Sequence, residues 1–127
     1  MKIAVIRSWS TGETRAAVVP EHVKKLVGLG AEVEVEEGTG RAAGFADDDY
    51  AEAGANLSWD RQKLLASADM VLSLSRPSLD DVNSIRKNSI YVGFLDPFNN
   101  KELVTAMAEG GIATFAMEMI PRITRAQ

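Results

Sequence analysis

The sequence predicts an α/β fold, a three-layer α/β/α sandwich around a parallel, flavodoxin- or Rossmann-like sheet of five or six strands. Short apolar runs alternate along the chain with segments whose apolar residues recur at helical spacing. A strand followed by a helix implies a right-handed crossover, and such crossovers place helices on both faces of a parallel sheet. With 127 residues, 46% of them apolar, the chain can bury one core, which predicts a single domain over residues 1–127.

Five strands are expected from short runs that are β-branched or otherwise apolar. They are Lys2 to Arg7, Glu32 to Glu36, Met70 to Leu74, Ile90 to Phe94, and Ile112 to Ala116. In sheets of this kind ligands bind beyond the carboxyl ends of the strands. The loops that can carry function therefore begin near Ser8, Gly38, Ser75, Asp96 and Met117.

Two helices are clearly marked. One begins at Pro20, a favourable first helical position, and stops at Gly30. The other follows a cap at Asn100 and ends at the Gly110-Gly111 pair. Weaker helical segments are expected over Asp48 to Ala53, Asp60 to Ser67, and Ser78 to Arg86.

Charge and composition exclude several classes of function. The net charge of −4 and the scattered basic residues argue against a nucleic-acid-binding surface. The chain has no cysteine, so it has no disulfide, thiolate metal site or thiol nucleophile. No run approaches the roughly 20 apolar residues of a membrane-spanning helix, so we expect no direct membrane insertion.

Three features that often mark sites have simpler explanations here. His22, the only histidine, is expected on the solvated face of a helix. The run Asp47 to Asp49 suits a helix N-terminus, where carboxylates are favoured by the helix dipole, better than a cation site. Trp59 is expected to pack against the sheet. We therefore predict no metal site.

Gly38-Thr39-Gly40 with Gly44 invites a dinucleotide-binding interpretation. However, three residues separate the second and third glycines, where the NAD fingerprint has two, and the loop follows the second predicted strand rather than the first. We interpret it as a turn whose glycines supply positive φ. The chain has no other phosphate-binding loop, so the domain alone is expected to bind NAD weakly or not at all.

The segment Ala116 to Gln127 reads Ala-Met-Glu-Met-Ile-Pro-Arg-Ile-Thr-Arg-Ala-Gln. It resembles, nearly residue for residue, a loop of the proton-translocating NAD(P) transhydrogenases, which continues there with Ser-Met-Asp. The segment Gly12 to Gly30 is similar to the opening motif that this family shares with alanine dehydrogenases. The resemblance covers the whole chain, and its two ends are the most specific parts.

The resemblance implies that the chain is the N-terminal domain of the α subunit, the NAD(H)-binding component, and that the NAD-binding Rossmann domain lies downstream and is absent here. NAD(H) would sit in the cleft between these domains, and hydride would pass directly to or from NADP(H) on another component. Carried over by motif, the catalytic residues are Arg122, on the nicotinamide side of NAD, and Gln127, toward the NADP ribose. Arg125 lies beside them as a further cofactor-binding residue. The isolated chain is expected to be inactive.

The same resemblance implies partners and a location. The partners are an NADP(H)-binding β subunit, a membrane component that moves protons, and a second copy of the NAD-binding component in a homodimer. The expected location is cytoplasmic, or the cytoplasmic face of the inner membrane as a peripheral part of a membrane complex.

Two alternatives remain open. In alanine dehydrogenases an arginine matching Arg15 holds the substrate carboxylate, so Arg15 is a candidate substrate-binding residue, although pairing with a surface glutamate explains it equally well. Those enzymes also carry a lysine and a histidine where this chain has Ser75 and Asp96, which opposes an alanine- or saccharopine-dehydrogenase function. A stand-alone, non-catalytic module is the other alternative.

Overall fold

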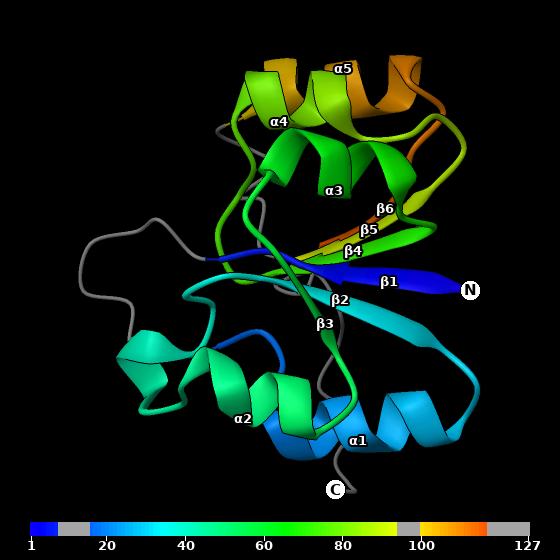
Figure 1. Ribbon diagram of the computed structural model, residues 1–127. Helices are drawn as coiled ribbons and strands as arrows, with labels where there is room; N and C mark the ends of the chain where they lie inside the picture. Colours follow the sequence, from blue (N-terminus) through cyan, green and yellow to red (C-terminus); the bar gives the residue numbers. More distant parts are fainter. Residues whose placement is uncertain (8–15, 94–99, 117–127) are drawn as a thin grey trace, which may run out of the picture.

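The computed structural model describes residues 1–7, 16–93 and 100–116, which contain a six-stranded, all-parallel sheet (Figure 1). The strands are β1 (Lys2–Val5), β2 (Glu32–Glu36), β3 (Asn56–Ser58), β4 (Met70–Ser73), β5 (Ile90–Gly93) and β6 (Ala113–Ala116). Their order across the sheet is β3-β2-β1-β4-β5-β6. The predicted parallel α/β fold is confirmed, and this order is that of the Rossmann fold rather than of flavodoxin.

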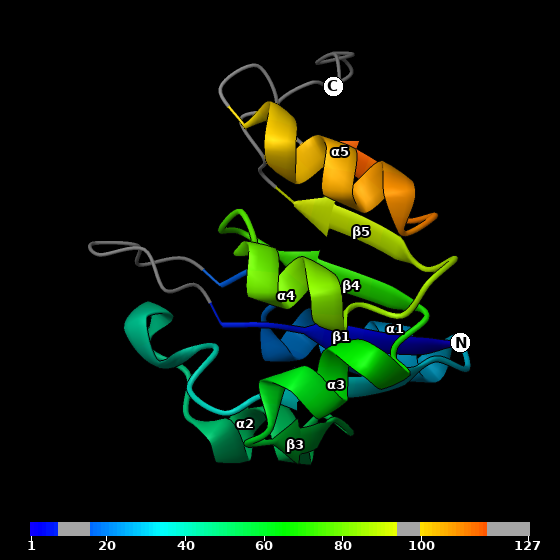
Figure 2. The same ribbon diagram turned by 90° about the horizontal axis from the view of Figure 1, so that it is seen from above.

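Helices cover both faces of the sheet, as the right-handed crossovers require (Figure 2). They are α1 (Pro20–Gly28), α2 (Asp47–Glu52), α3 (Arg61–Ser67), α4 (Leu79–Ser84) and α5 (Lys101–Glu109), with a short 3₁₀ turn, η1, at Arg41–Ala43. The first two lie on one face and α3, α4 and α5 lie side by side on the other. All five predicted helices are present, with ends shifted by a few residues.

The sixth strand, β3, was not among the five predicted from apolar runs. It has three residues, and only Leu57 among them is apolar, because β3 is an edge strand paired on one side with β2. The prediction that Trp59 packs against the sheet was wrong, since its side chain is 82% exposed. Trp59 follows the edge strand directly, and Asp60 then caps α3 by accepting from the Lys63 amide, so the chain turns away before the indole can be covered.

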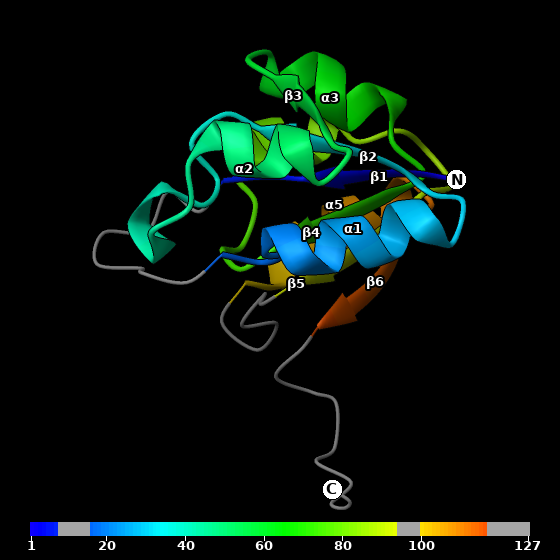
Figure 3. The same ribbon diagram turned by 60° about the horizontal axis from the view of Figure 1, so that its bottom comes forward.

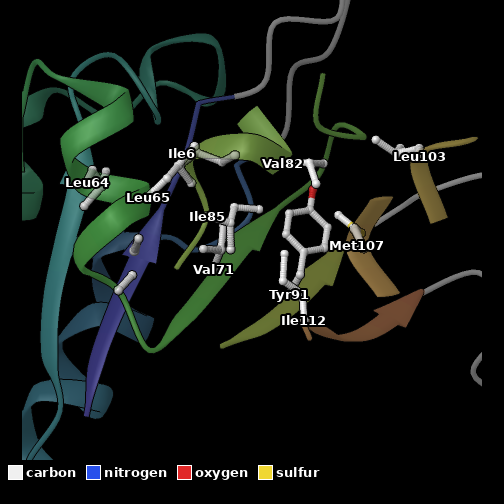
Figure 4. Packing of buried hydrophobic residues seen from close by; sticks show 12 residues of the cluster. Ile6, Leu64, Leu65, Val71, Val82, Ile85, Tyr91, Leu103, Met107 and Ile112 are labelled. Carbon is white, nitrogen blue, oxygen red and sulfur yellow. The ribbon is translucent and has the colours of Figure 1, made fainter. Parts of the chain in front are cut away.

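The core consists of two apolar clusters separated by the sheet. The cluster under α3, α4 and α5 is centred on Tyr91 and Met107, which are almost fully buried (Figure 4). The cluster under α1 and α2 contains alternate residues of β1 and β2, such as Val5 and Val35, together with Tyr50. Because successive side chains of a strand point to opposite faces, both clusters follow from the alternation within each strand.

The glycine-rich segment after β2 forms a turn, as predicted. Gly38 and Gly44 have φ values of +85° and +90°, which L-residues with a Cβ rarely adopt. Gly40 has a different reason to be glycine, since a Cβ there would overlap the Tyr50 hydroxyl and lie 2.8 Å from the Cβ of Phe45. Tyr50 cannot yield, because its ring is fully buried and its hydroxyl donates to the Val18 carbonyl at 2.9 Å.

Asp69 joins the amino ends of β1 and β4. Its carboxylate accepts from the Lys2 amide at 2.7 Å and from the Arg86 guanidinium at 2.6 Å. The Lys2 amide lowers the pKa of Asp69 most, partial desolvation opposes it, and the hydrogen bond and charge of Arg86 lower it further. The folded-state pKa of Asp69 is therefore below its ordinary value.

Replacing Gly40 with alanine should lower the free energy of unfolding by about 1–3 kcal/mol, the usual result of forcing extra volume into a packed core. Gly28→Ala is the matched control, because a Cβ at this helical position meets nothing within 4 Å. It should be neutral or stabilise by up to about 1 kcal/mol. Urea denaturation of both variants makes the comparison, and equal stabilities would contradict the packing described for Tyr50.

Asp69→Asn should destabilise the protein at neutral pH and much less in acid. Since the folded-state pKa lies below the roughly 3.9 of an unfolded aspartate, the stabilisation by Asp69 is fully present above that value and is lost as the pH falls through the folded-state pKa. The difference in unfolding free energy between wild type and variant should narrow below about pH 4. A difference that stays constant from neutral to acid pH would show that the carboxylate charge is not involved.

Candidate functional site

The candidate site lies at the carboxyl edge of the sheet, where β1 and β4 are neighbours. From β1 the chain passes to α1 on one face, and from β4 it passes to α4 on the other. This reversal of strand order is the topological switch point, which opens a crevice beyond the strand ends in sheets of this type. Arg7 follows β1 at this edge, and Ser75, Arg76 and Pro77 follow β4.

A buried ion network lies beside the crevice. Arg61, the first residue of α3, donates to both oxygens of Glu36 at the end of β2, at 3.0 and 2.8 Å, and to Asp81 of α4 at 3.0 Å. The three side chains are only 17%, 9% and 5% exposed, respectively. A planar guanidinium with five donors can serve two carboxylates in this way, whereas lysine cannot make the same bidentate contact.

The network also holds the backbone of Arg7. The Arg7 amide donates to Glu36 at 2.6 Å, and the Arg7 carbonyl accepts from Arg61 at 2.7 Å. The loop after β1 thus starts from a residue held by both members of the ion pair. Because Asp81 also receives the Ser78 amide in a capping box, the same network fixes the start of α4. Segments on both sides of the switch point are therefore held together.

Electrostatics explain why the network stays charged. Burial alone would lower the pKa of the Arg61 guanidinium, but the hydrogen bonds and charges of Glu36 and Asp81 outweigh it and raise that pKa above its ordinary value. An ion pair with so little solvent contact is well formed only if every charge has partners. Each of the three side chains meets this condition.

The network answers whether this edge fits a dinucleotide. In Rossmann domains an acidic residue about 20 positions beyond the glycine fingerprint, the place that Glu36 occupies at the end of β2, binds the adenosine ribose. Here both Glu36 oxygens are taken by Arg61 and the Arg7 amide. The sequence after β1, Arg7-Ser8-Trp9-Ser10-Thr11-Gly12, also lacks the Gly-x-Gly-x-x-Gly fingerprint. The residues present do not fit the usual dinucleotide site.

The turn after β4 is rigid and uncharged at its first residue. Ser75 is buried, and its carbonyl accepts from the Ser73 hydroxyl at 2.8 Å and from the Tyr91 hydroxyl at 2.9 Å. Gly93 of β5 allows this close packing, because a Cβ there would lie 2.5 Å from the Ser73 carbonyl oxygen. The position that carries lysine in alanine dehydrogenases therefore holds a buried serine, next to an exposed Arg76.

The other predicted residues divide into two groups. His22 is exposed on α1, and Asp47 to Asp49 form the first turn of α2, both as predicted. Among the described residues no group of three or more histidine, cysteine, aspartate or glutamate side chains could hold a metal ion. None of the described helices has the length and apolar character required to cross a bilayer.

The remaining candidate residues lie outside the part of the chain that the structure describes. They are Arg15, Asp96, Arg122, Arg125 and Gln127. The described edge therefore supplies the frame from which their loops start, and their assignment stays a prediction. Sequence reasoning missed Glu36, Arg61 and Asp81, the residues that build this frame.

The fold and this edge define a class: a Rossmann-topology α/β domain without its own dinucleotide fingerprint. The chain belongs to the alanine dehydrogenase/PNT N-terminal domain family, whose sequence model matches residues 4–127.

Relatives within this family fall into two kinds. An NAD(P) transhydrogenase subunit alpha of Rhodospirillum rubrum is 40% identical over 100% of this chain, and alanine dehydrogenase 1 of Staphylococcus aureus is 34% identical over the same span. The crystal structure of transhydrogenase from Sinorhizobium meliloti superposes with a TM-score of 0.92 at 37% identity, covering 100% of this chain and 38% of that one. The chain spans 34% of the length of either curated relative.

Arg61→Met should lower the free energy of unfolding by about 3–5 kcal/mol, because it leaves Glu36 and Asp81 buried without their counter-charge. Arg86→Met is the control, since the Arg86–Asp69 pair is 47% and 35% exposed and should matter far less. Chemical denaturation of both variants at neutral pH measures the difference. Similar losses in the two variants would show that the buried network does not hold this edge together.

Proposed function

We propose that this chain is the N-terminal domain of the NAD(H)-binding subunit of an NAD(P) transhydrogenase and forms one wall of the cleft that binds the dinucleotide. The full-length similarity to the Rhodospirillum rubrum and Sinorhizobium meliloti proteins supports this function. The observation that carries it is the chemistry of the carboxyl edge. That edge offers a fixed frame with no dinucleotide fingerprint of its own, as expected of a wall whose nucleotide site belongs to a second domain.

The domain's part in the reaction is to position loops. The segments after β1 and β4 start from Arg7 and Ser75, whose backbones are held by the contacts described above. All strands are parallel, so the segment after Ala116 of β6 leaves from the same edge. That segment carries Arg122, Arg125 and Gln127, which we assign to the nicotinamide side of NAD(H) and to the NADP ribose. Rigid starting points favour hydride transfer because donor and acceptor rings must be held within a narrow range of geometries.

The rest of the proposed assembly follows from this function. The partners are an NADP(H)-binding component and a proton-conducting membrane component, with a second copy of the NAD(H)-binding component as homodimer partner. The complete subunit binds NAD(H) and acts at the cytoplasmic face of the membrane. We expect the 127-residue chain alone to transfer no hydride.

The alternative enzyme is an alanine-dehydrogenase-like oxidoreductase. Similarity to alanine dehydrogenase 1 of Staphylococcus aureus favours it, and Arg15 would then hold a substrate carboxylate. Buried Ser75 opposes it, because a serine there provides neither the cation nor the general acid that reduction of a keto acid requires.

The test uses the subunit at the full length of its relatives, combined with the NADP(H)-binding component. Arg122→Ala should reduce hydride transfer from NADH to an NADP analogue by at least about tenfold, since a contact to the reacting ring would be lost. Lys24→Ala, on the exposed side of α1, is the control and should leave the rate unchanged. NAD-dependent oxidation of alanine by the wild type, or transfer unaffected by Arg122→Ala, would contradict the proposal.

A further inference from the structure

Two parts of the sheet are not covered by any described helix, and they differ in chemistry. On the face of α3, α4 and α5 the open part lies over the outer halves of β2 and β3. Its residues are polar, with Glu32 and Asn56 exposed and Glu34 paired with Lys2 at 2.8 Å. A hollow of about 320 Å³ beside Trp59 opens there. Polar side chains of this kind are compatible with water, so this part needs no cover.

The other open part lies over β5 and β6 on the face of α1 and α2. The sheet register aligns Met70 with Ile90 and Ala113, and Leu72 with Val92 and Phe115, on one face. The two β4 residues pack against the cluster under α1, but the four beyond them belong to neither core cluster. We call Ile90, Val92, Ala113 and Phe115 the β5–β6 strip. In Figure 3, β6 lies beside α1 with no described helix in front of it.

The strip is apolar throughout, and much of it is open. Ala113 and Phe115 are exposed, Phe115 to 53%, and Ile90 and Val92 are only partly buried. Parallel sheets are normally buried on both faces, and their strands are then apolar on both faces. The strands β5 and β6 have this two-sided pattern, since Tyr91 and Ala116 pack into the cluster on the opposite face. Their sequence is that of strands with a second cover.

We propose that a helix from the part of the subunit outside this 127-residue chain packs on the β5–β6 strip and completes the sandwich beside α1. The inference rests on the proposed function, under which the chain, like its match in the Rhodospirillum rubrum relative, spans about 34% of the subunit. A helix is the natural cover, because helices fill the remaining slots on both faces of this sheet. The strip carries no charge that would favour a dissociating, polar partner.

A second copy of the chain is the weaker occupant. Stable dimers bury about 800 Å² of surface on each partner, and four side chains, two of them already partly buried, offer much less. A segment of the same polypeptide needs no such area, since its tether gives it a high effective concentration at the strip. The limited area therefore favours a covalently attached helix.

Cysteine labelling tests the proposal, because the chain contains no cysteine of its own. Phe115→Cys places a thiol on the strip, and Glu32→Cys places one on the polar open part as the control. Both replace exposed side chains, so both variants are expected to fold. Maleimide labelling rates are measured in the 127-residue chain and in the subunit at its relatives' full length. In the full subunit the thiol at position 115 should react at least about tenfold more slowly than in the chain, since reaction then requires local opening. The thiol at position 32 should react at equal rates in both.

Equal rates at position 115 in chain and subunit would overturn the inference, as would a concentration-dependent dimer of the chain that protects this thiol. Hydride transfer by the same unlabelled subunit separates this result from the proposed function. An active subunit with an accessible strip refutes only the covering helix, and an inactive subunit with a protected strip refutes only the transhydrogenase function.

Discussion

The ion pair between Arg61 and Glu36 is the interaction on which the functional edge of this domain depends. It joins the end of β2 to the start of α3, and through Asp81 it reaches α4 on the far side of the switch point. The same two side chains hold the amide and carbonyl of Arg7. A buried network of this kind is poor evidence for high stability, because desolvation offsets much of the attraction. Its value here is geometric: it determines where the loops at the carboxyl edge begin.

The network also explains how a Rossmann topology can lack Rossmann function. The strand order opens a crevice at the expected place, and an acidic residue stands at the end of β2. That residue is committed to an internal guanidinium, and no glycine fingerprint follows β1. Fold and binding site are separable, and the residues at the edge decide whether a site exists. This domain has kept the frame and, in our proposal, left the nucleotide to another domain.

Much of the fold could be predicted from sequence, because it depends on local patterns. The alternation in Glu32 to Glu36 places valines on one face and glutamates on the other, and Pro20 marks where α1 begins. The edge strand β3 was missed, since an edge strand has little apolar surface to signal it. The Arg61 network was missed for a different reason. Its members are separated by 25 and 20 positions, and no spacing rule relates residues that meet only after three crossovers.

The uncovered strip on β5 and β6 adds a constraint that the sheet itself imposes. Strands that are apolar on both faces belong inside a sandwich, yet the described helices cover only one face of β5 and β6. The polar strands at the opposite edge show that openness alone requires no partner. The domain is therefore understood best as one part of a larger subunit, consistent with a nucleotide site that it does not itself contain.

The central claim, that this domain forms a wall of a dinucleotide cleft without a dinucleotide site of its own, is tested most directly by titrating the 127-residue chain with NADH and following nucleotide fluorescence. The account predicts no saturable binding up to about 1 mM, a concentration that corresponds to about 4 kcal/mol of binding free energy. Saturable binding in the micromolar range would mean that the carboxyl edge holds a nucleotide despite the engagement of Glu36, and would contradict the account.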